Sequence, residues 1–239
     1  GDYEKTMEIY TSSLKQAEQL GNQHEIGVSL KGIAFSYYNK GDFDKALDYT
    51  ERSFAVSEEI GGKNEMGQCL QNIGWIYTDK GDYNQAVDYY NRGLKIHEEL
   101  DIKQSIINGF ANLGLVYFYQ ENYNKAEKYL EKSGIMQFEI DNAIAPTVLF
   151  KITLEQLSFL FLSKKILGKE YNAGEIHTLI KKQEYIEYYI NFVLFKLLEN
   201  TSYLETAYNQ VQEKADNLEP DIAAKFLSYP IPKAIVEEW

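Results

Sequence analysis

Residues 70–90 read LQNIGWIYTDKGDYNQAVDYY, and the same pattern recurs along the chain at intervals of forty residues. Its triplet Gly81-Asp82-Tyr83 has three counterparts in the same register, which are Gly1-Asp2-Tyr3, Gly41-Asp42-Phe43 and Glu121-Asn122-Tyr123. A small residue follows each triplet at a fixed offset: Thr6, Ala46, Ala86 and Ala126. A fixed period with the same content in each copy is typical of an array of stacked repeats.

Each forty-residue block predicts two helices joined by a tight turn. Leu70, Ile73 and Tyr77 recur at three- and four-residue spacing, as on one face of a helix. Gly81 then tolerates the left-handed backbone of a turn, and a second helix follows through Tyr90. Residues that tolerate turns are expected to close the second helices at Gly21, Gly61, Asp101 and Asp141. The two helices are expected to approach closely at small residues, which are Ala34, Gly74 and Gly114 on the first helices and Ala46, Ala86 and Ala126 on the second.

These positions resemble the tetratricopeptide repeat family. The family pattern of a large apolar residue, Leu-Gly, Tyr, Ala and an aromatic residue is matched by Leu70, Ile73, Gly74, Tyr77, Ala86 and Tyr90. The next block matches it with Phe110, Leu113, Gly114, Tyr117, Ala126 and Leu130. The chain lacks the closing proline, and its period is forty rather than the usual thirty-four residues. It therefore looks like the long-helix subclass of kinesin light chains, Pins-type polarity scaffolds and prokaryotic signalling proteins. The resemblance implies an all-α, right-handed solenoid of antiparallel helix pairs that binds proteins or peptides.

The repeat register predicts how the chain is divided. Residues 1–141 are expected to form the array, with a half repeat at 1–20 and three repeats at 23–60, 63–100 and 103–140. The chain opens on a turn triplet, so the partner helix of the half repeat is missing and we expect a fragment of a longer array. Residues 142–239 are predicted to be a degenerate helical cap continuous with the solenoid. A separate partner-binding or dimer-forming module is the alternative.

Within that C-terminal region the pattern is weaker. A helix is expected from Pro146, which suits a first helical turn, to about residue 167, followed by a loop at 168–174. One long helix is expected over residues 175–200, buried from residue 185 onward because it is apolar almost all round. The further expected elements are a helix opened by the capping box Ser202-x-x-Glu205, a short element begun by Pro220, a break at residues 229–232 and a last turn at 234–239.

Composition narrows the class of partner and the compartment. The net charge of −12 repels phosphate backbones and anionic lipid, so neither nucleic acid nor a membrane is an expected partner. The single cysteine, Cys69, cannot form an internal disulfide and fits a reducing compartment. The opening residues lack the features of a signal peptide, and the most apolar run, at residues 189–198, is too short to span a bilayer. These features predict a cytoplasmic protein.

No residue pattern predicts a catalytic, cofactor or metal site, so the chain is not expected to be an enzyme. His24, His97 and His177 are not at metal-ligand spacing, and Cys69 has no cysteine companion. His97 and its neighbours Glu98 and Glu99 are interpreted as solvated surface near a helix end.

The family resemblance places the binding residues on the concave face, which the first helices line. Carried over position by position, the predicted partner-binding residues are Lys31, Phe35, Tyr38, Gln68, Gln71, Asn72, Trp75, Asn108, Asn112, Leu115 and Phe118. In the related arrays an asparagine at the position of Asn72 and Asn112 hydrogen-bonds the backbone of a bound peptide, because an amide offers both a donor and an acceptor. Pairing of these asparagines between adjacent repeats is the competing interpretation. Trp75 is interpreted either as a rigid anchor for a ligand side chain or as a bridge between repeats.

Three functional hypotheses stay open at this point. The first is a passive scaffold that holds an extended peptide or partner segment through its backbone and apolar side chains. The second is a ligand-gated signalling regulator that resembles the quorum-peptide receptors. Homo-oligomerisation through the open N-terminal end or the C-terminal helices could accompany either. A basic clamp for a C-terminal carboxylate is not expected, because Lys31 is the only predicted positive charge on this face.

Overall fold

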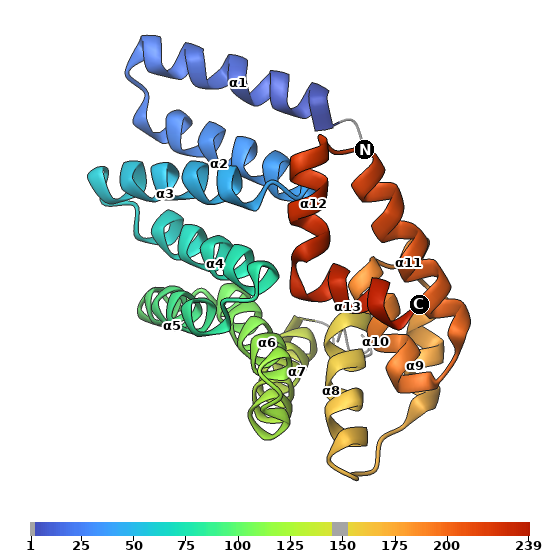
Figure 1. Ribbon diagram of the computed structural model, residues 1–239. Helices are drawn as coiled ribbons and strands as arrows, with labels where there is room; N and C mark the ends of the chain where they lie inside the picture. Colours follow the sequence, from blue (N-terminus) through green and yellow to red (C-terminus); the bar gives the residue numbers. More distant parts are fainter. Residues whose placement is uncertain (1–2, 145–152) are drawn as a thin grey trace. The chain divides into compact units, whose positions relative to one another are not determined.

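The computed structural model describes residues 3–144 and 153–239, and every regular element in these ranges is an α-helix (Figure 1). Their contacts define two compact units. Unit 1 comprises Gly1–Asp101 and Lys214–Tyr229, and unit 2 comprises Ile102–Glu213 and Pro230–Trp239. The expected all-α class is confirmed, whereas a single array through residue 141, continuous with its cap, stays a prediction.

Unit 1 contains the half repeat and the first two full repeats. Its helices are α1 (Tyr3–Leu20), α2 (Gln23–Lys40), α3 (Phe43–Glu59), α4 (Lys63–Lys80), α5 (Tyr83–Glu99) and α12 (Pro220–Ser228). Each of α1 to α5 packs against the next helix in sequence, as antiparallel hairpins do (Figure 1). A full repeat is therefore one hairpin, with α2 and α4 as first helices and α3 and α5 as second helices.

Unit 2 begins with the third full repeat and continues into the non-repeat region. Its helices are α6 (Lys103–Tyr119), α7 (Tyr123–Ile144), α8 (Leu154–Ile166), α9 (Ala173–Ile180), α10 (Tyr188–Leu198), α13 (Pro230–Glu238) and α11 (Thr201–Asp216), whose residues 214–216 belong to unit 1. Helix α6 pairs with α7, and α8 packs against both of them and against α10. A core of Leu157, Phe159, Leu160 and Leu194 joins these elements.

The recurring triplet is explained by the turn between the two helices of a repeat. Gly81 has a left-handed backbone, with φ of 83°, and its N–H donates to the carbonyl of Thr78 at 3.0 Å. Asp82 is the N-cap of the next helix, because its carboxylate accepts the backbone N–H of Gln85 at 3.2 Å. Gly41 and Asp42 repeat this arrangement. The triplet is thus a helix stop followed directly by a helix start.

The small residues of the repeats lie where the two helices come closest, as expected. A Cβ atom on Gly74 would lie 2.6 Å from the ring of Tyr90, and one on Gly114 would lie 2.6 Å from Cγ of Leu130. Both facing residues are buried. The first repeat carries a different pair at these positions, Ala34 and Thr50, which are also buried. The close approach is therefore kept by matching a smaller residue on one helix with a larger one on the other.

Several sequence-based boundaries were wrong. Helix α7 continues through Asp141 to Ile144, so Asp141 does not close it. The helix expected over residues 175–200 is two helices, because the polar run 181–184 is exposed and has no apolar face to bury. The N–H groups of Lys182 and Gln183 donate to carbonyls three residues back, which closes α9.

The ends of the last helices also differ from expectation. Asn200, not Ser202, caps α11, since its side-chain oxygen accepts the N–H of Ser202 at 3.1 Å. Pro220 begins α12 as predicted. The expected break at residues 229–232 is shorter, because Pro230 and Pro232 lie in the first turn of α13, where a missing N–H breaks no helical hydrogen bond. The predicted helix start at Pro146 lies outside the described residues.

His97 is buried rather than solvated. Its ring occupies space left by Gly67, where a Cβ atom would lie 2.5 Å from its Nε2 atom. Burial lowers the pKa of His97, so the ring is neutral near pH 7. The sequence-based interpretation failed because it weighed the exposed neighbours Glu98 and Glu99 and did not consider the missing side chain on the facing helix.

We predict that Gly74→Ala destabilises the chain when Tyr90 is present and not when Tyr90 is replaced by threonine. In the first case the new methyl group meets the tyrosine ring, an overpacking that costs about 1–3 kcal/mol. In the second case the pair becomes the Ala/Thr pair that the first repeat already contains. Denaturant unfolding of the four proteins of this double-mutant cycle measures the coupling. Equal effects of Gly74→Ala in both backgrounds would contradict the packing account.

Candidate functional site

A shallow pocket opens in unit 1 between the first helices α2 and α4. It encloses about 310 Å³, counting the space at its open mouth. Its lining residues are Ala34, Phe35, Tyr38, Thr50, Asn72, Trp75 and Ile76. Four of these were predicted as partner-binding residues: Phe35, Tyr38, Asn72 and Trp75. We call this feature the aromatic pocket.

The aromatic pocket lies beside the position where the repeats differ in side-chain size. Thr50 lines it, whereas the equivalent residues of the next two repeats are Tyr90 and Leu130. The Thr50 hydroxyl donates to the carbonyl of Ala46 at 2.7 Å, so its polar atom is satisfied within its own helix. Thr50 therefore contributes a small, apolar surface to the wall. The size difference at residue 50 is the sequence signal that could have located this pocket, together with Ala34 and Ile76, which were not predicted as site residues.

Two aromatic rings of the pocket are unusually accessible for their size. The exposed fraction of Phe35 is 58%, and that of Trp75 is 44%. They occupy the same position in successive repeats and line the same pocket from α2 and α4. Large rings that stay exposed on a folded surface can bury a partner's side chain with little loss of conformational freedom.

Asn72 supplies the polar group of the pocket. Its side chain is half-buried and makes no hydrogen bond to any part of the chain that the structure describes. Pairing of Asn72 between adjacent repeats is therefore not observed in the described residues. Its amide can donate to one peptide group and accept from another.

A second polar contact joins α2 and α4. The ammonium of Lys31 donates to the Oε1 atom of Gln68 at 3.0 Å. Both residues were predicted for this face, as was Gln71, which is half-buried on α4. The positive charge of Lys31 is thus engaged with a neutral amide, which leaves the pocket without an ion-pairing group.

Tyr38 connects the pocket to a carboxyl group behind it. Its hydroxyl donates to Oδ2 of Asp79 at 2.6 Å. Burial raises the pKa of Asp79 to about 6, although the hydrogen bond from Tyr38 and the charge of Lys214 act in the opposite direction. Asp79 therefore exchanges its proton near neutral pH, next to a residue that lines the pocket.

The predicted residues of the third repeat lie in unit 2 and have different surroundings. Asn108 is exposed, whereas Asn112 is buried and its side-chain nitrogen has no partner among the described residues. Leu115 and Phe118 pack against the core of unit 2, and the ring of Phe118 lies 5.0 Å from that of Phe159. Repeat periodicity could not show that α8, a non-repeat helix, covers this part of α6.

The described residues offer little for chemistry. They contain no group of three or more His, Cys, Asp or Glu side chains that could hold a metal ion. Cys69 is buried, and burial raises the pKa of its thiol, which disfavours the reactive thiolate. In the same part of the chain, no helix has the length and apolar character needed to cross a membrane.

We predict that Asp79→Asn stabilises the folded protein at pH 7.5 and has little effect at pH 4. The folded-state pKa of about 6 lies above the ordinary value of 3.8, so ionisation of Asp79 destabilises the fold as pH rises through 6. Asparagine removes that charge and keeps an acceptor for Tyr38. Thermal unfolding of both proteins at the two pH values tests this. A gap between the unfolding midpoints that is the same at both pH values would show that the charge of Asp79 is not responsible.

Comparison with known proteins agrees with the helical hairpins and their turns. Residues 25–99 match a family model described as tetratricopeptide repeat, and residues 110–133 match a second model with the same description. No curated protein matches the chain in sequence.

Solved structures with a similar fold have low sequence identity to this chain. The apo form of RapI has a TM-score of 0.64 at 13% identity and covers 100% of this chain and 94% of its own. A Rap protein complexed with Competence and Sporulation Factor has a TM-score of 0.63 at 16% identity, with 97% of this chain and 69% of that chain covered. A kinesin light chain from Podosopora anserina has a TM-score of 0.56 at 16% identity, with 84% and 90% covered. The turn triplets, the close helix contacts and these matches together show that the chain belongs to the tetratricopeptide repeat family.

Proposed function

We propose that this chain is a non-catalytic binding module that holds an extended peptide or a segment of a partner protein against α2 and α4. The observation that carries the proposal is the aromatic pocket, where the exposed rings of Phe35 and Trp75 flank an Asn72 amide without a hydrogen bond to the described chain. The fold agrees with this role, since tetratricopeptide repeats are typically binding scaffolds.

The chemistry of the pocket favours one kind of ligand. An apolar or aromatic side chain of the partner would lie between the two exposed rings, while Asn72 would bond the partner's backbone. The Lys31–Gln68 contact leaves no free cation to select a carboxylate. The net charge of −12 argues further against nucleic acid and anionic lipid as partners. The single reduced cysteine fits the cytoplasm, which we include in the proposal.

A ligand-gated regulator is the second candidate. It is favoured by the hydrogen bond from Tyr38 in the pocket wall to Asp79, which gives an occupant a route to the rest of unit 1. The similar fold of a Rap protein complexed with Competence and Sporulation Factor agrees with a peptide ligand. Scaffold and regulator share the same pocket and differ in whether binding changes the rest of the protein. Assembly of copies of this chain is compatible with either candidate.

We predict that Trp75→Ala weakens binding of a peptide by at least about tenfold, as expected for an aromatic residue that anchors an interface. The peptide is selected on the wild-type protein from a random phage-displayed library, and its affinity is measured by fluorescence polarisation. The matched control is Trp239→Ala, which removes the other tryptophan, 56% exposed and located in unit 2. An unchanged affinity in a folded Trp75→Ala protein would exclude the pocket as the binding site.

We also predict that the affinity of the same peptide changes less than about twofold between low and physiological ionic strength, because amide and apolar contacts are hardly screened by salt. Titrations at the two salt concentrations measure this directly. A steep loss of affinity with added salt would show that charged groups outside the aromatic pocket dominate binding.

A further inference from the structure

A segment near the end of the chain packs on the first full repeat. Residues 214–229, which we call the strap, consist of the last turn of α11, a short connection and α12, and they belong to unit 1 (Figure 1). The ring of Phe226 is fully buried, and it lies 3.2 Å from the site of a Cβ atom on Gly41. Leu218 approaches the same glycine at 3.7 Å. The strap therefore covers the turn between α2 and α3.

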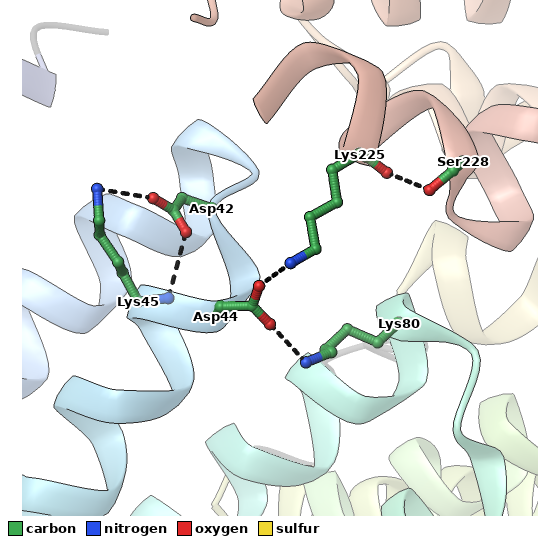
Figure 2. Close-up of polar contacts among 6 residues, drawn as sticks. All are labelled: Asp42, Asp44, Lys45, Lys80, Lys225 and Ser228. Carbon is green, nitrogen blue, oxygen red and sulfur yellow. Dashed lines mark hydrogen bonds and ion pairs between the residues drawn. The ribbon is translucent and has the colours of Figure 1, made fainter. Parts of the chain in front are cut away.

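Ion pairs tie the strap to two helices of the array. Figure 2 shows that the carboxylate of Asp44 on α3 accepts hydrogen bonds from Lys225 on the strap and from Lys80 at the end of α4, the latter at 2.7 Å. These two hydrogen bonds hold the pKa of Asp44 below its ordinary value, so the pair with Lys225 persists at neutral pH. All three groups are partly exposed, so the pairs direct the contact more than they stabilise it.

The repeats themselves provide an internal comparison for this contact. The third residue of the triplet is tyrosine at positions 3, 83 and 123, and phenylalanine only at Phe43. Phe43 is 2% exposed, and its ring lies 4.8 Å from that of Tyr229 in the strap. Tyr83, at the same place in the next repeat, is half-buried. The repeat that carries the strap is thus the one that lacks a hydroxyl needing a hydrogen-bond partner.

The docked strap also contains a local defect. The hydroxyl of Tyr229 is buried and has no hydrogen-bond partner among the residues described. Burial and the nearby carboxylates of Asp44, Asp42 and Asp79 raise the pKa of Tyr229 to about 12, so the hydroxyl stays protonated. An unsatisfied buried hydroxyl costs free energy that is regained on exposure to water. This lowers the cost of releasing the strap.

A continuous set of ring contacts leads from the strap to the aromatic pocket. Tyr229 packs on Phe43, and the ring of Phe43 lies 5.4 Å from that of Tyr38. Tyr38 lines the pocket and is fixed from behind by its hydrogen bond to Asp79. Movement of the strap therefore acts on the ring that supports Tyr38.

We propose that the strap controls the aromatic pocket: docked, it holds Tyr38 in the pocket wall through Phe43, and its release weakens binding of the partner. This inference rests on the proposed function and adds a means of regulating it. Coupling between two equilibria is reciprocal, so an occupant of the pocket also strengthens docking of the strap. The strap thereby turns a passive binding surface into one that responds to whatever engages residues 214–229.

The test uses Lys225→Glu, which places a second carboxylate against Asp44 and repels the strap without removing any buried side chain. Lys95→Glu is the matched control, because it makes the same charge change at an exposed position of α5 in the same unit. Amide hydrogen exchange, read by mass spectrometry, reports whether α12 is released. If Lys225→Glu leaves α12 protected, Phe226→Ala removes the main apolar contact; failure of both to release α12 overturns the proposal.

Two readouts then report on the pocket. With Trp239→Phe as background, Trp75 is the sole tryptophan, and we expect release of the strap to shift its emission, with no shift in the Lys95→Glu control. With the peptide selected on the wild-type protein, we expect strap release to raise Kd by at least about fivefold. Faster exchange of α12 with unchanged Trp75 emission and unchanged Kd would overturn the inference. If no peptide binds the pocket, the proposed function fails, while the emission of Trp75 still decides whether strap and pocket are coupled.

Discussion

The close contact between the two helices of each repeat is the constraint on which the other features depend. Gly74 faces Tyr90 and Gly114 faces Leu130, and neither glycine has room for a methyl group. Because both positions lie inside helices, their glycines lower helix propensity and are retained for packing. The fixed distance between the helices sets the turn triplet at the end of each hairpin and the alignment of successive first helices.

The aromatic pocket follows from a change in that same contact. In the first repeat the larger side chain is missing, and Thr50, the smallest residue at its position in the three repeats, lines the opening. Helices held at the spacing of the array cannot collapse fully onto a small residue, since the contacts at Ala46 and its counterparts keep them in place. A hollow of this origin is rigid and lined by apolar atoms, as a preformed binding pocket requires.

Sequence reasoning was most successful where the physics is local and periodic. The turn triplet, the small contact residues and the division into hairpins follow from rules that involve neighbours at fixed offsets, and four predicted binding residues do line one pocket. It failed where a contact joins distant or non-repeat segments. The covering of Phe118 by Phe159, the burial of His97 against Gly67 and the docking of Phe226 on Gly41 each depend on a partner that no period predicts. The polar run at residues 181–184 ended a helix for a similar reason, because apolar content was counted without asking which face it would bury.

The central claim is that the space between Phe35 and Trp75 receives a side chain of the partner. The indole N–H groups of the two tryptophans give separate nuclear magnetic resonance signals, which makes Trp239 an internal reference for Trp75. Titration with a selected peptide should move the Trp75 signal progressively to saturation and leave that of Trp239 in place. A peptide that saturates the protein while the Trp75 signal stays unmoved would contradict the account.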